Sequence, residues 1–177
     1  MENKMKKTLC QLLCLSALAL MAAEEKNTPY DLYSKEVRAA LKGKESYVSL
    51  CDSVLTFQAA PGQKLPWAWR TVSLPLNFSS RKTGQEFSFR ISGELKLLNV
   101  EPGKQSEGVI LYLSALQNGK RIWKFFSGIP RYGNTEWIPF TGEFKLSANT
   151  ETPVLLCGLN NVSGTFGIRN LSITEME

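Results

Sequence analysis

Phe87-Ser88-Phe89-Arg90-Ile91-Ser92-Gly93-Glu94-Leu95-Lys96-Leu97 is the stretch that decides the fold class. Apolar and polar residues alternate along most of it. Because successive side chains of a strand point to opposite faces, this pattern is typical of an antiparallel strand that is buried on one face and solvated on the other. The stretch therefore predicts a long strand in a sheet whose second face meets water.

The residues on either side of this stretch continue the β pattern. Val109 to Leu116 is almost continuously apolar, as expected of a central strand, and Asn118-Gly119 after it is a strong signal for a tight hairpin. Short strands joined by turn-rich loops, with no alternating helices, predict an all-β protein with a jelly-roll β-sandwich. The other strands are expected within residues 47–57, 72–78, 121–126, 137–146, 154–159 and 165–174. Pro75 places its strand at a sheet edge.

One short helix is expected before the strands. Thr28 can cap a helix, and Pro29 suits the first helical position. Gly43 is a suitable stop. These signals predict a helix over residues 29–42. One face would carry Tyr30, Tyr33, Val37, Ala40 and Leu41.

The first residues have the features of a secretory signal peptide. Lys4, Lys6 and Lys7 precede a mostly apolar run from residue 9 to 20, and small residues lead to Ala23. The run is shorter than the ~20 apolar residues of a membrane anchor. We therefore predict a signal peptide (1–23), a helical lead-in (24–44) and a β-sandwich domain (45–177). The expected location is secreted, periplasmic or cell-surface, with no membrane span in the mature chain.

Charge and cysteine content limit the partners. The formal net charge is +5, but Lys and Arg are scattered, so nucleic-acid binding is not indicated. Cys51 and Cys157 remain after the signal peptide, and an exported protein can oxidise them. Sequence leaves two alternatives open, a Cys51–Cys157 disulfide or two buried thiols in separate strands.

The residues that most enzymes use for acid–base chemistry are scarce. The chain has no histidine, which excludes the Ser-His-Asp and Cys-His arrangements and the HExxH zinc motif. Asp31 and Asp52 are the only aspartates, and the glutamates are scattered. No glycine-rich phosphate loop follows a strand into a helix. We predict a protein that is not an enzyme and has no cofactor.

Aromatic residues are the remaining candidates for a binding site. Trp67 and Trp69 are two residues apart, as are Trp123 and Phe125, so each pair shares a face of its strand. Outward-facing rings would form a flat apolar platform suited to sugar rings; the alternative is that they fill the core. Trp137 is interpreted as core. The predicted ligand-binding residues are Trp67, Trp69, Tyr112, Trp123, Arg90 and Arg131, with the arginines supplying hydrogen bonds.

The C-terminal half resembles carbohydrate-binding modules of the family 4/9/22 type, which are galactose-binding-like jelly rolls. The resemblance rests on Asn118-Gly119, Trp123, the stretch Trp137-Ile138-Pro139-Phe140-Thr141-Gly142-Glu143-Phe144, and the closing stretch from Gly164 to Glu175. It covers roughly residues 66–175. The family often has Asp in the closing strand, where it helps to hold a structural calcium ion. Arg169 and Asn170 stand there in this sequence, which argues against calcium.

These observations predict an exported, non-catalytic protein that binds a glycan or surface polysaccharide through an aromatic platform on a β-sandwich. The alternative is an exported structural or protein-interaction jelly roll, whose rings are buried or dock another exported protein. Fold alone does not decide between them.

Overall fold

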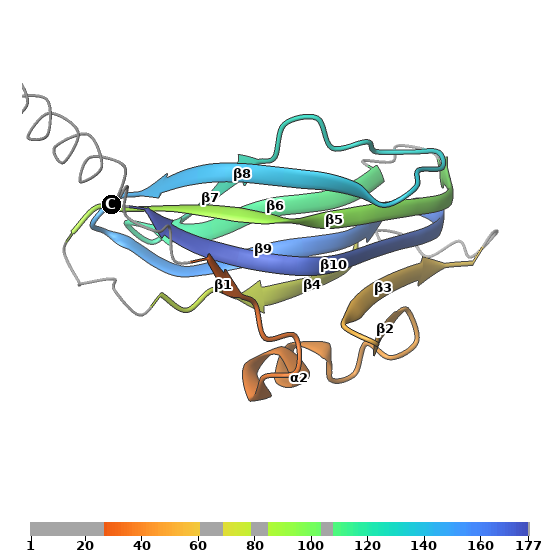
Figure 1. Cartoon of the computed structure of the whole chain (residues 1–177), viewed down its shortest axis with the longest axis horizontal. Helices are drawn as coiled ribbons and strands as arrows, with labels where there is room; N and C mark the ends of the chain where they lie inside the picture. Colours follow the sequence, from red (N-terminus) through yellow and green to blue (C-terminus); the bar gives the residue numbers. More distant parts are fainter. Residues whose placement is uncertain (1–26, 61–68, 79–84, 104–107, 177) are drawn as a thin grey trace, which may run out of the picture.

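The computed structural model describes residues 27–60, 69–78, 85–103 and 108–176, most of which form two antiparallel sheets packed face to face (Figure 1). Sheet A has the strand order β2-β3-β10-β5-β8, and β1 also pairs with β10. Sheet B has the order β4-β9-β6-β7. The strands are β1 Asn27–Pro29, β2 Val48–Cys51, β3 Val54–Ala59, β4 Trp69–Pro75, β5 Phe87–Pro102, β6 Gly108–Gln117, β7 Lys120–Phe125, β8 Ile138–Leu146, β9 Thr150–Asn160 and β10 Val162–Met176.

The connections make the sandwich a jelly roll. From β3 to β10 the chain crosses from one sheet to the other at every step except the β6–β7 hairpin. The eight strands of the jelly roll are β3-β10-β5-β8 of sheet A and β4-β9-β6-β7 of sheet B, and β1 and β2 are additions to sheet A. The predicted jelly-roll β-sandwich is confirmed, and β4, which contains Pro75, lies at a sheet edge as expected.

The two strongest strand signals correspond to β5 and β6. β5 begins at Phe87 and pairs with both β8 and β10, so it is an inner strand of sheet A. β6 pairs with β7 through a hairpin in which Asn118 and Gly119 have φ of 52° and 73°, as the turn favoured by Asn-Gly requires.

The core lies between the inner faces of the two sheets. Alternate residues of each strand point into it, and neighbours of opposite parity point outwards. Sheet A contributes Leu55, Phe57, Phe89, Ile91, Leu95, Leu97, Phe140, Phe144, Phe166 and Ile168, and sheet B contributes Val72, Leu74, Val109, Leu111, Leu113, Leu155, Cys157 and Leu159.

The helix is shorter than predicted. It is α2, Lys35–Leu41, and its cap is Ser34, whose Oγ accepts a hydrogen bond from the Val37 N–H. The residues from Asn27 to Pro29 form β1 instead, because they pair with Ser172–Thr174 of β10. The prediction that the helix starts at residue 29 is wrong, since pairing with a distant strand overrides the local signals at Thr28 and Pro29.

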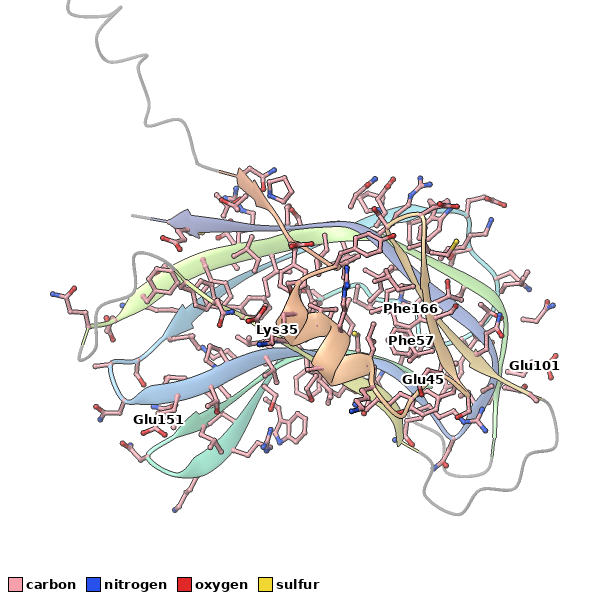
Figure 2. All side chains as sticks on the ribbon, turned by 90° about the horizontal axis from the view of Figure 1, so that it is seen from below. Lys35, Glu45, Phe57, Glu101, Glu151 and Phe166 are labelled. Atoms are coloured by element: carbon pink, nitrogen blue, oxygen red, sulfur yellow. The ribbon has the colours of Figure 1, made fainter. Side chains whose placement is uncertain are left out.

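Residues 27–44, called here the N-terminal segment, close one open side of the sandwich. The Tyr30 N–H donates to the Leu171 carbonyl of β10 at 2.9 Å, and the Tyr30 hydroxyl donates to the Pro75 carbonyl of β4 at 2.7 Å. Leu32 and Val37 are buried in the core. In the view from below, α2 lies across this side of the sandwich (Figure 2). The segment thus links sheet A to sheet B.

The predicted signal peptide, residues 1–23, lies outside the described residues. Within the described residues, no helix is long and apolar enough to cross a membrane.

Candidate functional site

Three aromatic rings gather on the outer face of sheet B, the face turned away from the core. β6 and β7 place them there, because Tyr112 pairs with Phe125 and Ser114 pairs with Trp123 in the hairpin register. The Tyr112 ring meets the Phe125 and Trp123 rings nearly edge-on, with centroids 4.5 Å and 6.4 Å away. We call Tyr112, Trp123 and Phe125 the aromatic face.

Two of these rings are open to solvent. Trp123 is 41% exposed and Phe125 is 61% exposed, whereas Tyr112 is buried beside them. Ile110 and Leu156 form a small buried apolar cluster with Tyr112, separate from the main core. The aromatic face therefore has an apolar base that supports exposed rings, and these rings are available to a partner.

Arg121 borders the aromatic face at one end. Its guanidinium carbon lies 5.9 Å from the centroid of the Trp123 ring, and its Nη1 donates to Ser114 Oγ at 3.0 Å. These two contacts hold the guanidinium beside the exposed indole, where hydrogen-bond donors meet an apolar surface.

Arg131 and Tyr132 border the other end. The Arg131 carbonyl accepts a hydrogen bond from the Val109 N–H at 3.1 Å. A Cβ atom placed on Gly108 would lie 2.9 Å from Arg131 Cβ and 3.0 Å from Tyr132 Cε1. Arg131 and Tyr132 therefore pack against β6 at a position where any residue larger than glycine would clash with them. Gly108 thus leaves room for Arg131 and Tyr132 at the edge of the outer face.

Asn160 lies on the same outer face, opposite Gly108 in the register. It is buried, and its Oδ1 has no hydrogen-bond partner among the described residues. An unpaired buried acceptor lowers stability, and such groups are rare in folded proteins.

The structure brings three of the predicted site residues to this face and separates the others. Tyr112 and Trp123 lie together, and Arg131 lies at the edge. Trp67 lies outside the described residues. Trp69 opens β4 opposite Asn160, but its side chain is outside the described part.

Arg90 is placed elsewhere, which corrects the prediction. It lies in β5 of sheet A, on the opposite layer of the sandwich, and its guanidinium pairs with Glu143 at 2.8 Å. Strand alternation correctly predicts that Arg90 points outwards, but it does not say which sheet the strand joins. Trp137 also differs from its prediction as core, since it is half-buried on the outside of sheet A. Its indole lies 4.3 Å from the Arg169 guanidinium carbon.

Phe125, Arg121 and Tyr132 are absent from the predicted site residues. Phe125 and Arg121 share the parity of Trp123 in β7, so the same alternation contains the signal for both. Tyr132 follows β7 in a loop, where no periodicity applies, and only the fold brings it to Gly108.

The comparisons with known proteins come from structure alone. No protein-family model matches the sequence, and no curated protein matches it. Among the similar solved structures are two carbohydrate-binding modules and one protein part that contains such a module.

The first is a module named CBM4, with 13% identity over 74% of this chain and 76% of that one, and a TM-score of 0.45. The second is the CBM22-1 and GH10 part of xylanase 10B from Clostridium thermocellum, in complex with xylohexaose. Identity is 15% over 55% of this chain and 18% of that one, with a TM-score of 0.35. The third is the ligand-free CBM1 module of BiXyn10A, with 17% identity over 86% and 98%, and a TM-score of 0.46. At these values the likeness carries no argument about a ligand.

The closing strand does not offer a calcium site. At the positions where the resembled family often has Asp, Arg169 Nε and Asn170 Nδ2 both donate to Glu94 Oε2, at 2.8 Å and 2.6 Å. The hydrogen bond from Arg169 holds the pKa of Glu94 below its usual value. The Glu94 carboxylate is already paired with the positively charged Arg169 guanidinium, so the residues at this position do not fit a calcium ion.

The two cysteines are free thiols in different places. Cys51 is exposed at the end of β2 in sheet A, where a hydrogen bond to Asp52 raises the pKa of its thiol. Cys157 is fully buried in β9 of sheet B, with its Sγ 3.8 Å from the Val72 carbonyl oxygen, and burial raises its pKa. No disulfide joins them, because Cys51 is exposed at the surface whereas Cys157 is fully buried and points into the core.

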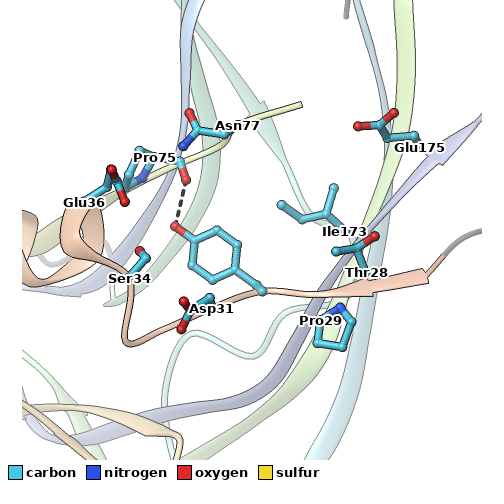
Figure 3. Close-up of a pocket in the computed structure, with 10 residues that line it drawn as sticks. Thr28, Pro29, Asp31, Ser34, Glu36, Pro75, Asn77, Ile173 and Glu175 are labelled. Atoms are coloured by element: carbon cyan, nitrogen blue, oxygen red, sulfur yellow. Dashed lines mark hydrogen bonds between the residues drawn. The ribbon is translucent and has the colours of Figure 1, made fainter. Parts of the chain in front are cut away.

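A cavity of about 290 Å³ lies beside the N-terminal segment, between β4 and β10 (Figure 3). Asp31, Glu36 and Glu175 line part of it, and its one aromatic ring is Tyr30. The Tyr30 hydroxyl already donates to Pro75. The cavity shares no residue with the aromatic face and belongs to the packing of the N-terminal segment. Among the described side chains, no group of three or more His, Cys, Asp or Glu residues is placed to hold a metal ion.

Proposed function

We propose that this protein is an exported, non-catalytic module that binds a glycan on the aromatic face of sheet B. The exposure of Trp123 and Phe125 over a buried apolar base carries the proposal. Exposed aromatic rings rimmed by polar groups mark interaction sites. Sugars present flat C–H surfaces that stack on rings and hydroxyl groups at their edges.

The rim supplies the second part of such a site. The Arg121 guanidinium borders one end of the face and Arg131 lies beside Gly108 at the other, and each arginine carries several N–H donors for sugar hydroxyls. Arg121 is also oriented by Ser114 and Trp123, so little side-chain freedom is lost when it binds. The export part of the proposal rests on the basic and apolar N-terminal sequence up to Ala23.

The test is binding of the chain from Glu24 onwards to a panel of soluble neutral and acidic polysaccharides, measured by affinity electrophoresis and by calorimetry. We expect Trp123→Ala and Phe125→Ala each to raise the Kd for any bound polysaccharide about tenfold, which corresponds to ~1.4 kcal/mol of lost stacking.

Trp137→Ala is the matched control, because it removes an indole from the other outer face. It should leave the Kd unchanged, with thermal unfolding confirming that each variant is folded. If no polysaccharide binds, or if Trp123→Ala binds as tightly as the native chain, the proposal is wrong.

A further inference from the structure

The described basic side chains on the outer face of sheet A are all paired with carboxylates of the same chain. Strands β5, β8 and β10 carry four basic residues, and each makes an ion pair with a carboxylate. The nitrogen–oxygen distances run from 2.5 to 3.1 Å. The pairs are Arg90–Glu143, Lys96–Glu136, Lys145–Glu86 and Arg169–Glu94.

The arginines beside the aromatic face lack such partners. Within the described part of the chain, neither Arg121 nor Arg131 makes an ion pair. Arg121 Nη1 instead donates to the neutral hydroxyl of Ser114. Glu151 is the carboxylate that the register brings nearest to Arg121, since both lie opposite Leu116 on neighbouring strands. Their backbones are two strand spacings, roughly 10 Å, apart, and no ion pair forms.

The uncompensated charge lies beside the exposed rings. The Arg121 guanidinium carbon lies 5.9 Å from the centroid of the Trp123 ring, so the positive charge adjoins the surface on which a sugar would stack. A guanidinium offers paired N–H donors whose geometry matches a carboxylate. Hydrogen bonds from an ionised donor to an ionised acceptor are also roughly twice as strong as those between neutral groups. An acidic sugar would use this arginine better than a neutral one.

We propose that the ligand of the aromatic face is a polyuronate, a polysaccharide whose sugar units carry carboxylate groups. This inference rests on the proposed glycan-binding function and names its substrate class. The carboxylate of a uronic acid projects from the edge of the sugar ring. A ring stacked on Trp123 with that edge turned to Arg121 would place its carboxylate beside the guanidinium.

Arg131 extends the same charge pattern along the face. Arg121 lies level with Leu116 of β6, and Arg131 lies beside Gly108, eight residues along the same strand. That separation is roughly 27 Å, too long for one sugar. A polymer that carries repeated carboxylates can meet both arginines, so longer chains are expected to bind more tightly than single uronic acids.

The experiment compares polysaccharides that differ only in charge. Polygalacturonate and alginate are offered to the chain from Glu24 onwards, each beside its fully esterified form, in which the carboxylates are neutral. We expect the acidic form of at least one to bind at least tenfold more tightly than its ester at low salt. The preference should shrink as salt rises, because salt screens the charges.

Variants separate the contributions of charge and ring. Arg121→Gln is expected to remove most of the preference for the acidic form, and Arg131→Gln to reduce it for long chains only. Trp123→Ala should weaken binding to both forms. Arg90→Gln is the matched control, because Arg90 is paired with Glu143 on the opposite sheet, and it should change neither affinity.

Each result bears on one of the two claims. Equal binding of the acidic and esterified forms, or preference for a neutral polysaccharide, would overturn the polyuronate inference and leave glycan binding in place. Tighter binding of dextran sulfate or single-stranded DNA than of either polyuronate would overturn it as well, because the face would then respond to any polyanion. Failure to bind any polysaccharide would overturn the proposed function itself.

Discussion

At the scale of single residues, two ionisable side chains are held neutral by their surroundings. Burial raises the pKa of the Cys157 thiol and of the Tyr30 phenol above their ordinary values of 9.0 and 10.0. Cys157 lies in the core, and Tyr30 spans the gap between β10 and β4. Each group binds its proton more tightly in the folded chain than in the unfolded chain, so folding stability depends on pH in the alkaline range.

We expect the free energy of unfolding to be constant with respect to these groups below pH 9 and to fall as the pH rises further. The unfolded chain loses the Cys157 proton from about pH 9.0 and the Tyr30 proton from about pH 10.0, while the folded chain keeps both. Urea unfolding at a series of pH values measures this.

Two variants measure how much of the slope comes from Cys157 and from Tyr30. Cys157→Ala should flatten the profile from pH 9 upwards, and Tyr30→Phe should flatten it from pH 10 upwards. Tyr30→Phe should also cost about 1 kcal/mol at neutral pH, because it removes the hydrogen bond to Pro75. A native profile that stays level to pH 11 would contradict the assignment.

The residue scale also shows what sequence alone can predict about the site. Alternation places Trp123 and Phe125 on one face and Arg90 on a polar face, and both predictions agree with the structure. Alternation shows only which residues of one strand share a face. It does not show which other strands lie beside that strand. It therefore cannot show that Arg90 and Trp123, which the sequence assigns to one site, belong to different sheets.

At the scale of elements, β8 shows how one small residue makes room for a ring from the other sheet. Its inner face reads Phe140, Gly142, Phe144, and Phe126 packs against both rings from just beyond the end of β7, with centroids 5.4 Å and 5.0 Å away. A Cβ atom on Gly142 would lie 2.7 Å from Phe126 Cδ1. The absence of a side chain at Gly142 is what lets Phe126 enter the core.

Gly142→Ala is therefore expected to lower the free energy of unfolding by ~1–3 kcal/mol, the usual range for an overpacked core. Thermal or urea unfolding measures it. Thr141→Ala, on the exposed face of the same strand, is the control and should change stability by less than about 0.5 kcal/mol. If the two variants unfold alike, the packing argument for Gly142 fails.

The elements also mark where prediction from sequence ends. β5 and the β6–β7 hairpin follow from patterns within about ten residues, because alternation and Asn-Gly are local signals. The start of the helix does not follow from a local pattern. Residues 27–29 form a strand instead of a helix, because Asn27 pairs with Thr174, which lies 147 positions away in the sequence. Strand pairings between residues so far apart in the sequence cannot be predicted from the pattern of neighbouring residues.

At the scale of the whole molecule, the N-terminal segment completes the core although it lies outside the eight strands of the jelly roll. Leu32 and Val37 bury their side chains among residues from the sandwich, and full burial of such a side chain stabilises by ~1.5–3 kcal/mol. Two such residues represent a large share of the ~5–15 kcal/mol that holds an ordinary domain folded.

A chain that begins at Glu45 should therefore be mostly unfolded, or should unfold at a much lower urea concentration than the chain from Glu24. It should also bind a dye specific for exposed apolar surface, because the side closed by α2 is then open. The control begins at Asn27 and keeps the whole segment. If the chain from Glu45 unfolds at the same urea concentration as the control, the segment is an accessory and not part of the core.

The strand order fixes when the molecule can fold. β9 lies between β4 and β6, and β10 lies between β3 and β5, so the middle of each sheet is filled by one of the last two strands. While a ribosome is still synthesising the chain, neither layer can be completed, because the pairs β2–β3, β5–β8 and β6–β7 can form but the strands that join them come last. The proposed export through a secretion pore would be served by this order, because the chain remains without its complete sandwich until its last two strands have been made.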